Sequence, residues 1–316
     1  MRILVLGGTA FVGRAIVEQA LSRGDEVTLF SRGRSGLELF PEAARLTGNR
    51  DTGDYTALTG TSWDAVIDVS GYVPRHVQQA SAAVRAGRYL FISTGSVYDL
   101  KQAPDVITED APRLSPERDT EVIDGETYGP LKVACEDDVL SLHGSAATIV
   151  RPGIVAGPYD PTDRFTYWVR RAARGGRLAL AGRPDQPVQV VDSRDLAHLV
   201  VQLLHDDRAG LFNAVGPAEP VTLQGLVQAC ARAAGSSIKI VPVDTALVDP
   251  PLPLVLADPS ADVAFRRSAT AARAVGLSAT PLETTAADVL AWDTERGAPA
   301  LSVGLSEQQE TALLNG

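Results

Sequence analysis

Several residue types are scarce in this sequence, and each shortage excludes a class of protein. With only two cysteines, Cys135 and Cys230, the chain has no disulfide framework and no CxxC pair for a metal. No apolar run reaches the roughly 18 residues that a membrane span needs, and the first residues lack the long apolar stretch of a signal peptide. We therefore expect a cytoplasmic protein.

Basic charge is also limited, because 29 lysines and arginines face 39 acidic residues, which gives a net charge of −10. Such a surface repels phosphate backbones and anionic lipid headgroups, so we expect neither a nucleic acid nor a membrane as partner. Lysine is the scarcer base and occurs only at Lys101, Lys132 and Lys239. The four histidines have no metal-ligand spacing, and we expect no metal site.

The remaining composition, 45% hydrophobic and 22% charged, is typical of a folded globular protein of one large or two modest domains. Short apolar runs alternate with segments of helical period. The expected strands are 2–7, 26–30, 65–70, 88–94 and 147–152, and the expected helices are 11–24, 74–87 and 126–144. This alternation predicts an α/β fold with a doubly wound parallel sheet of the Rossmann type.

After residue 155 the alternation weakens and proline and glycine become frequent. We predict a first domain of the Rossmann type, a class of domain that binds dinucleotides, made of 1–155 plus about 187–215. A smaller C-terminal α/β domain, which is left to bind a substrate, takes about 156–186 plus 216–316. The proline-rich stretch 244–265 has no predicted structure.

The first predicted strand leads into a glycine-rich turn, and a predicted helix follows. Glycines allow a tight turn that brings backbone N–H groups and the positive helix end to a pyrophosphate. Ala10 stands at the middle glycine of the usual spacing, so the turn should differ slightly in shape. The predicted cofactor contacts are Gly7, Thr9, Ala10, Phe11, Val12 and Gly13.

The end of the second predicted strand selects between the two nicotinamide dinucleotides. NAD-binding proteins place an acid here for the ribose hydroxyl, whereas NADP-binding proteins place a base for the 2′-phosphate. This chain has Ser31, Arg32 and Arg34 and no acid. We therefore predict NADP(H) in preference to NAD(H), the alternative being a solvated basic loop.

Further cofactor contacts are expected where other strands end. Asn49 and Arg50 follow a probable third strand and lie where a loop would reach the adenine. Ser70 and Gly71 end the 65–70 strand, where small residues let a cofactor lie close.

Tyr128 and Lys132 lie four residues apart in a predicted helix and therefore share one face. A neighbouring ammonium favours the phenolate, which makes a tyrosine usable as a general acid or base. The alternative is a partly exposed tyrosine beside a solvated lysine.

Hydroxyl groups lie at the carboxyl end of the predicted strand 88–94 and just beyond it. Ser93, Thr94 and Ser96 come at its carboxyl end, where open α/β sheets bind ligands. A hydroxyl there can donate to a substrate oxygen that gains negative charge, or it can simply cap the loop.

Together these segments resemble one family. GGTAFVG, STGSVY, YGPLK followed by Glu136, IVRPGIVAGP and VVDSRDLA are similar, in this order, to the extended short-chain dehydrogenase/reductase family, also called the NAD-dependent epimerase/dehydratase family. The resemblance runs from residue 1 to about 215. It implies that Tyr128 is the acid/base, that Lys132 binds the nicotinamide ribose and tunes Tyr128, and that Thr94 binds substrate. It also implies that the segment from Pro152 to Ile154 lies beside the nicotinamide.

Two departures from the family pattern bear on the substrate. Members that bind the phosphates of a nucleotide sugar often carry an arginine just before the segment that matches VVDSRDLA, whereas this chain has Val188 and Gln189 there, which disfavours a nucleotide sugar. Dehydratases of the family follow the threonine with Asp-Glu, whereas this chain has Gly95 and Ser96, so dehydration is disfavoured. A loop rich in polar and aromatic residues falls where the family builds its substrate wall. We expect substrate contacts at Ser96, Asp163, Arg164, Tyr167 and Trp168, or else a helix start whose aromatic rings pack inward.

These observations predict an NAD(P)-dependent oxidoreductase that moves hydride between the nicotinamide and a carbonyl or secondary alcohol of a small, polar, sugar-like or natural-product substrate. A sugar epimerase with tightly bound cofactor and no net redox change is the first alternative. A non-catalytic relative that senses dinucleotides or binds RNA is the second. A homodimer through helices 74–87 and 126–144 is a further expectation.

Overall fold

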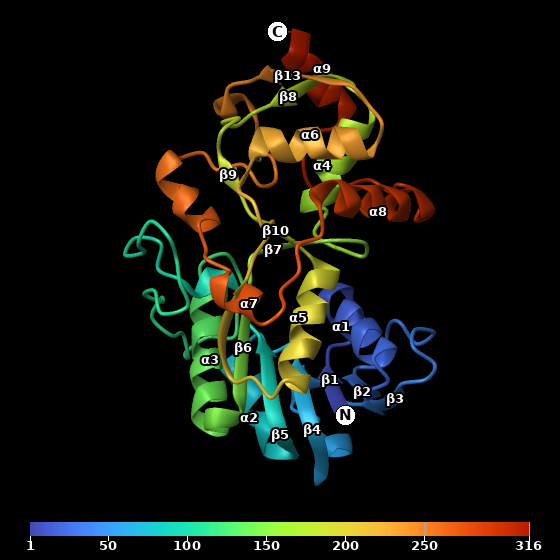
Figure 1. Ribbon diagram of the computed structural model, residues 1–316, viewed down its shortest axis with the longest axis vertical. Coiled ribbons are helices and arrows are strands. Elements are labelled where there is room, and N and C mark those ends of the chain that lie inside the picture. The colour runs from blue at the N-terminus through green and yellow to red at the C-terminus, as the bar shows by residue number, and fades with distance from the viewer. Residues whose placement is uncertain (250, 316) are drawn as a thin grey trace. The chain divides into compact units, whose positions relative to one another are not determined.

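The computed structural model describes residues 1–249 and 251–315, and these divide into two compact units (Figure 1). The first unit contains 1–153, 193–215 and 267–278, and the second contains 154–192, 216–266 and 279–316. The boundaries differ from the sequence expectation at two places. Residues 187–192 belong to the second unit because their short strands pair there, and 267–278 return to the first unit.

The first unit is built on a parallel sheet of seven strands in the order β11-β6-β5-β4-β1-β2-β3, which confirms the predicted fold class. The strands are β1 (Arg2–Leu6), β2 (Glu26–Ser31), β3 (Ala44–Thr47), β4 (Thr61–Asp68), β5 (Val84–Ile92), β6 (Ala147–Pro152) and β11 (Gly210–Ala214). The chain order reverses between β1 and β4, and ligands of open α/β sheets bind at the carboxyl ends of the strands beside such a reversal.

Helices cover this sheet because apolar strands buried on both faces need partners. They are α1 (Phe11–Ser22), α2 (Pro74–Ala83), α3 (Tyr128–His143), α5 (Ser193–His205) and α7 (Thr270–Ala274). Helix α1 packs against α5 and α2 packs against α3 (Figure 1). Side chains of α2 and α3, such as Val77 and Val139, share one buried cluster with Leu4, Val66 and Phe91 of the sheet.

One helix boundary differs from the expectation. Helix α2 ends at Ala83, not at residue 87, and Val84 begins β5. The reason is pairing: Val84, Arg85 and Ala86 lie beside Thr61, Ser62 and Trp63 of β4, which also starts earlier than expected. The ladder satisfies the backbone groups that a continued helix would have used.

The second unit has its own apolar core and only short pairs of strands. Its strands are β7 (Ile154–Ala156), β8 (Gly176–Leu180), β9 (Pro187–Val188), β10 (Val190–Asp192), β12 (Val221–Thr222) and β13 (Ile238–Pro242). Its helices are α4 (Arg164–Ala173), α6 (Leu223–Ala233), α8 (Leu282–Glu295) and α9 (Glu307–Asn315). The stretch that had no predicted structure contains short 3₁₀ turns at Thr245–Leu247 and Pro259–Phe265. Among the described residues, no helix is both long and apolar enough to span a membrane.

Candidate active site

The glycine-rich turn joins the end of β1 to the start of α1. Gly7 has φ +94°, and a Cβ there would lie 2.8 Å from the Ser70 Cβ. A Cβ on Gly13 would lie 2.0 Å from the Gly7 carbonyl oxygen, so this approach requires glycine. Ala10 has an extended backbone, φ −131° and ψ 142°, which a methyl group tolerates. The altered spacing therefore keeps a closed turn.

This turn presents a backbone surface suited to phosphate. The first N–H groups of any α-helix lack acceptors within the helix and carry its positive end. Helix α1 has 12 residues and no acidic residue in its first turn, so no carboxylate of that turn competes for those groups. Thr9, Phe11 and Val12 are half-buried around the same turn.

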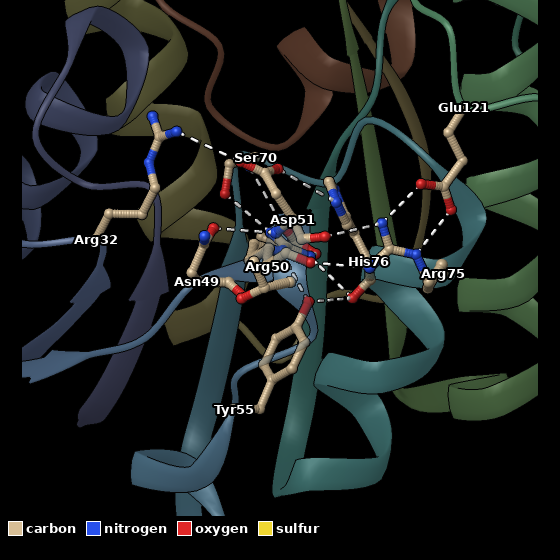
Figure 2. Close-up of polar contacts among 11 residues, drawn as sticks. Arg32, Asn49, Arg50, Asp51, Tyr55, Ser70, Arg75, His76 and Glu121 are labelled. Atoms are coloured by element: carbon tan, nitrogen blue, oxygen red, sulfur yellow. Dashed lines mark hydrogen bonds and ion pairs between the residues drawn. The ribbon is translucent and has the colours of Figure 1, made fainter.

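The basic residues at the end of β2 are exposed. The side chain of Arg32 is 56% exposed and its Nη1 lies 3.4 Å from Asp51 Oδ2 (Figure 2). Arg34 is exposed as well, while the Ser31 hydroxyl accepts a hydrogen bond from the Gly33 N–H. An exposed ion pair of this kind contributes little energy, so Arg32 can exchange its partner readily.

Arg50 corrects the expectation of an adenine contact from its side chain. Its guanidinium points into the protein and bonds both oxygens of Asp68, at 2.5 and 2.8 Å. It also bonds the Ser70 hydroxyl and the His76 carbonyl (Figure 2). A buried carboxylate requires a paired cation, and this demand decides where the arginine points. Asn49 instead caps the following turn by accepting from the Asp51 N–H.

Among the predicted site residues, Lys132 has the best-defined contacts. Its side chain is buried, and its Nζ donates to the carbonyl oxygens of Gly71 at 2.9 Å and of Ile92 at 2.7 Å. The ammonium also lies 4.0 Å from the centre of the Phe91 ring. Burial lowers the pKa of Lys132 to about 8, and the nearby Cys135, Asp68 and Glu136 oppose that shift.

Tyr128 is the first residue of α3 and is half-buried one turn before Lys132. The helix therefore brings the two residues of the predicted pair to one face, as their spacing requires. Gly129 follows Tyr128, and a Cβ there would lie 2.5 Å from the Ser96 carbonyl oxygen. This close approach places the start of α3 against the loop after β5.

The hydroxyl residues after β5 have different surroundings. Thr94 is half-buried and accepts from the Ser96 N–H at 3.1 Å, which caps a short 3₁₀ turn. Ser96 is exposed. The Ser93 hydroxyl is buried and has no hydrogen-bond partner among the described residues. A buried hydroxyl without a partner is costly, which is consistent with a group that a ligand satisfies.

The remaining predicted cofactor residues end neighbouring strands. Pro152 is the buried last residue of β6 in the first unit, and Ile154 is the half-buried first residue of β7 in the second. Ser70 donates to the Leu6 carbonyl, and Gly71 lends its own carbonyl to Lys132.

The predicted substrate contacts at Tyr167 and Trp168 need correction, because both rings lie in the core of the second unit. Trp168 is fully buried and its indole donates to the Pro253 carbonyl. Asp163 is also buried and accepts from Arg296 and Ser302. The strong helical period of α4 turns these residues inward. Arg164 remains half-exposed, and its substrate contact stays a prediction.

Sequence reasoning missed Asp68 and Tyr89, whose hydroxyl donates to Asp68 Oδ2 at 2.8 Å. It also missed the buried pair of Glu136 and Arg151, joined at 2.7 and 2.8 Å. A charged residue inside an apolar strand, as in AVID and ATIVR, is the signal that was present.

The residues in the first unit fit a bound dinucleotide. The turn has no room for a Cβ at Gly7 or Gly13, and the buried Ser93 hydroxyl has no hydrogen-bond partner among the described residues. Two of the three N–H donors of Lys132 bond backbone carbonyls, which leaves the third for a ligand. The glycine-rich turn would hold the pyrophosphate, and the N-terminal end of α3 would face the nicotinamide half of the dinucleotide.

The chain is similar in sequence to proteins from a plant and from bacteria. The chloroplast stem-loop binding protein of 41 kDa b from Arabidopsis thaliana is 26% identical over 254 residues, which cover 74% of this chain and 63% of that protein. The 2-alkyl-3-oxoalkanoate reductase from Stenotrophomonas maltophilia is 27% identical over 269 residues, covering 75% of this chain and 76% of the reductase. The chain thus spans less than two thirds of the plant protein's length.

Solved structures share the fold. UDP-glucuronic acid 4-epimerase from Bacillus cereus, solved in complex with NAD, superposes with a TM-score of 0.69 at 16% identity, covering 93% of this chain and 99% of that one. A model of the NAD dependent epimerase/dehydratase family matches residues 3–214, which include the turn, the strands and the Tyr128–Lys132 pair. The chain therefore belongs to the NAD dependent epimerase/dehydratase family, whose members are NAD(P)-dependent enzymes.

Proposed function

We propose that this protein is an NADP(H)-dependent oxidoreductase that moves hydride between the nicotinamide and a carbonyl or secondary alcohol of a small polar substrate. The observation that carries the proposal is the setting of Lys132. Its ammonium is buried, held by two backbone carbonyls, and one helical turn from Tyr128. A merely structural lysine would be expected to reach solvent or an acid.

The nicotinamide, when bound, supplies or takes the hydride. The phenol of Tyr128 gives the proton to the substrate oxygen during reduction and takes it back during oxidation. The Thr94 hydroxyl donates to the same oxygen as negative charge develops. Lys132 holds positive charge close by, which stabilises the phenolate form of Tyr128, and its third N–H would hold a ribose hydroxyl of the cofactor.

A panel of small polar carbonyl compounds with NADPH tests the proposal through the loss of reduced-nicotinamide absorbance. Tyr128→Phe should lower kcat by about 100-fold or more while NADPH still binds. Lys132→Met should lower both activity and cofactor affinity, whereas the matched Lys239→Met, at an exposed position of β13, should lower neither. Full activity in Tyr128→Phe would disprove the assignment of the acid/base.

The preference for NADP(H) rests on Arg32, which is exposed and only loosely held by Asp51. A guanidinium forms strong charge-assisted bonds to a phosphate. Arg32→Ala should therefore weaken NADPH much more than NADH, measured as the two dissociation constants. An equal loss for both cofactors would show that Arg32 does not read the 2′-phosphate.

Epimerization is the second candidate, because UDP-glucuronic acid 4-epimerase has the same fold. An epimerase returns its cofactor to the starting redox state, so substrate would be converted without a net change in nicotinamide absorbance. A third candidate follows from the name of the plant stem-loop binding protein. The net charge of −10 opposes it, and a gel-shift titration with stem-loop RNA would decide.

A further inference from the structure

A buried ion pair lies beneath the candidate site. Asp68 is the fully buried last residue of β4, and it receives two hydrogen bonds from Arg50 and one from Tyr89. Its carboxylate keeps a lowered pKa although burial opposes this, because Arg50 and Tyr89 bond the charged form. The pair is thus charged in the folded protein.

The same pair holds the turn that follows β4. Asp68 Oδ1 accepts from the Ser70 N–H at 3.1 Å, and Arg50 Nη1 donates to the Ser70 hydroxyl at 2.9 Å (Figure 2). A Cβ on Gly71 would lie 3.0 Å from Asp68 Oδ2 and 2.8 Å from the Phe91 ring. The Gly71 peptide is therefore fixed directly against the carboxylate.

That peptide in turn holds Lys132. Its carbonyl accepts from Lys132 Nζ at 2.9 Å, and the Phe91 ring that touches the Gly71 position is the ring 4.0 Å from Nζ. The backbone carbonyls of Arg50 and Asp51 accept from Arg75, whose guanidinium also pairs with Glu121 in the segment before α3 (Figure 2). One continuous set of contacts joins the turn after β3 to the lysine.

We propose that the Arg50–Asp68 pair is a positioning unit for Lys132, in which the pair fixes the Gly71 carbonyl and the Asp68 carboxylate supplies negative charge that offsets the burial of the ammonium. The inference rests on the proposed role of Lys132, but it concerns the state of the lysine and does not require a known substrate. Arg50 and Asp68 act through Lys132 and do not touch the reacting atoms.

The charges around Lys132 make the sign of the effect testable. Asp68 from β4 and Glu136 and Cys135 from α3 favour its protonated form, whereas Arg50 disfavours it. The Tyr72 ring lies 5.8 Å from Nζ, and Tyr128 begins the same helix. Removing the charge of Asp68 leaves Arg50 uncompensated, so both changes lower the pKa of the lysine.

The titration can be observed directly because the chain has three lysines, and Lys101 and Lys239 are exposed. Protein labelled with ¹³C- and ¹⁵N-lysine gives one shifted side-chain signal, which Lys132→Met assigns by its loss. In Asp68→Asn the midpoint of this signal should fall by about one pH unit or more. The control is Asp25→Asn, which removes a buried carboxylate at the other end of the strands, beside the amino group of Met1 and His205.

An unchanged Lys132 titration in folded Asp68→Asn would overturn the proposal. So would an equal shift in Asp25→Asn, because the effect would then report general loosening. If Tyr128→Phe keeps full activity but Asp68→Asn still shifts the lysine, the proposed function fails and the positioning unit stands.

Arg50→Lys provides a second test should Asp68→Asn fail to fold. This variant keeps the charge of the pair, but one ammonium cannot reach both Asp68 oxygens, Ser70 and His76 as the guanidinium does. The Lys132 signal should move and NADPH should bind about fivefold more weakly, the equivalent of one lost hydrogen bond. If Tm falls while the Lys132 signal and the NADPH affinity stay unchanged, the pair only stabilises the fold and the proposal is wrong.

Discussion

At the scale of single residues, Gly13 makes the closest backbone approach of the cofactor turn. In Gly13→Ala the new methyl group would lie 2.0 Å from the Gly7 carbonyl oxygen, so the turn must open. Overpacking of this kind costs about 1–3 kcal/mol, and NADPH affinity measured by titration calorimetry should fall about tenfold or more. The control is Ala10→Gly, where the extended backbone needs no glycine. Equal affinities for the two variants would contradict this account of the turn.

Asp51 gives a second prediction at this scale. Its carboxylate is 63% exposed and lies beside Arg32, so under the proposed preference for NADP(H) it would repel the 2′-phosphate. Asp51→Asn should strengthen NADPH binding about two- to fivefold at low salt and leave NADH nearly unchanged, and added salt should remove the gain. Glu26→Gln, an exposed change at the opposite end of β2, is the control. A gain for NADH as large as that for NADPH would rule out the phosphate as its cause.

The direction of the Arg50 side chain could not be predicted from the sequence. The sequence located the turn after the third strand correctly, because strand ends and polar residues mark such turns. It did not indicate that the guanidinium would turn inward, because the acid that draws it, Asp68, lies 18 residues further along the chain. The direction of a long side chain depends on such distant partners, and local pattern does not contain them.

At the scale of elements, α3 carries the residues to which we assign the proposed chemistry. Tyr128, Lys132 and Glu136 follow one another at intervals of one turn, and the last two are buried. The helix was predicted within two residues of its bounds at either end, because Gly144 follows it and ends it. The pairing of Glu136 with Arg151 of β6 was not predictable, since it depends on the order of strands.

A prediction at this scale concerns the free energy of unfolding, to which the Glu136–Arg151 pair between α3 and β6 contributes. Glu136→Gln would leave the buried Arg151 without its charged partner, and such a loss costs about 3–5 kcal/mol. Urea unfolding should show this as a lower midpoint with an unchanged slope. Glu18→Gln breaks an exposed pair with Arg14 on α1 and should cost less than about 0.5 kcal/mol. Similar midpoints for both variants would show that burial does not set the cost.

Elements of the second unit were predicted less well for a physical reason. Strand β8 pairs with β13 and β7 with β10, partners that lie tens of residues apart and are only three to five residues long. Such strands form because a partner completes their hydrogen bonds, not because their sequence demands it. For the segment of α4 the sequence left two interpretations open, a substrate wall or a helix whose aromatic rings pack inward. The buried Phe165 and Trp168 favour the second.

At the scale of the whole molecule, the chain enters each compact unit more than once. The return of 267–278 to the first unit, where α7 packs on β11, was not predicted. The sequence pattern indicates helix in two pieces over 270–297, but it does not indicate which unit the first piece joins. The parallel sheet was predicted, without its number of strands, because apolar strands and helices alternate over the first 155 residues. The long helices and strands of the first unit were therefore predicted from the sequence, whereas the return of a short segment to that unit was not.

Buried histidines predict how the stability of the folded molecule depends on pH. Burial lowers the pKa of His143, whose ring stacks on Tyr89 with centroids 4.2 Å apart and whose Nε2 lies 2.9 Å from the Ser81 hydroxyl. Burial, followed by Arg50 and Arg75, also lowers the pKa of His76. Both rings therefore stay neutral in the folded state where the unfolded chain already binds protons.

The sign of the effect follows from these directions. The contribution of both rings is fully present above the unfolded histidine pKa of about 6.5. It is lost as the pH falls from there through the lower folded values, because the unfolded state gains protons first. Tm should therefore fall between pH 7.5 and pH 5.5, above the range in which carboxylates begin to titrate. His143→Gln keeps a partner for Ser81 without a titrating ring, so its Tm should fall less steeply over that interval. If the variant loses as much Tm as the parent protein, His143 is not a source of the acid sensitivity, and His76→Gln then tests the other ring.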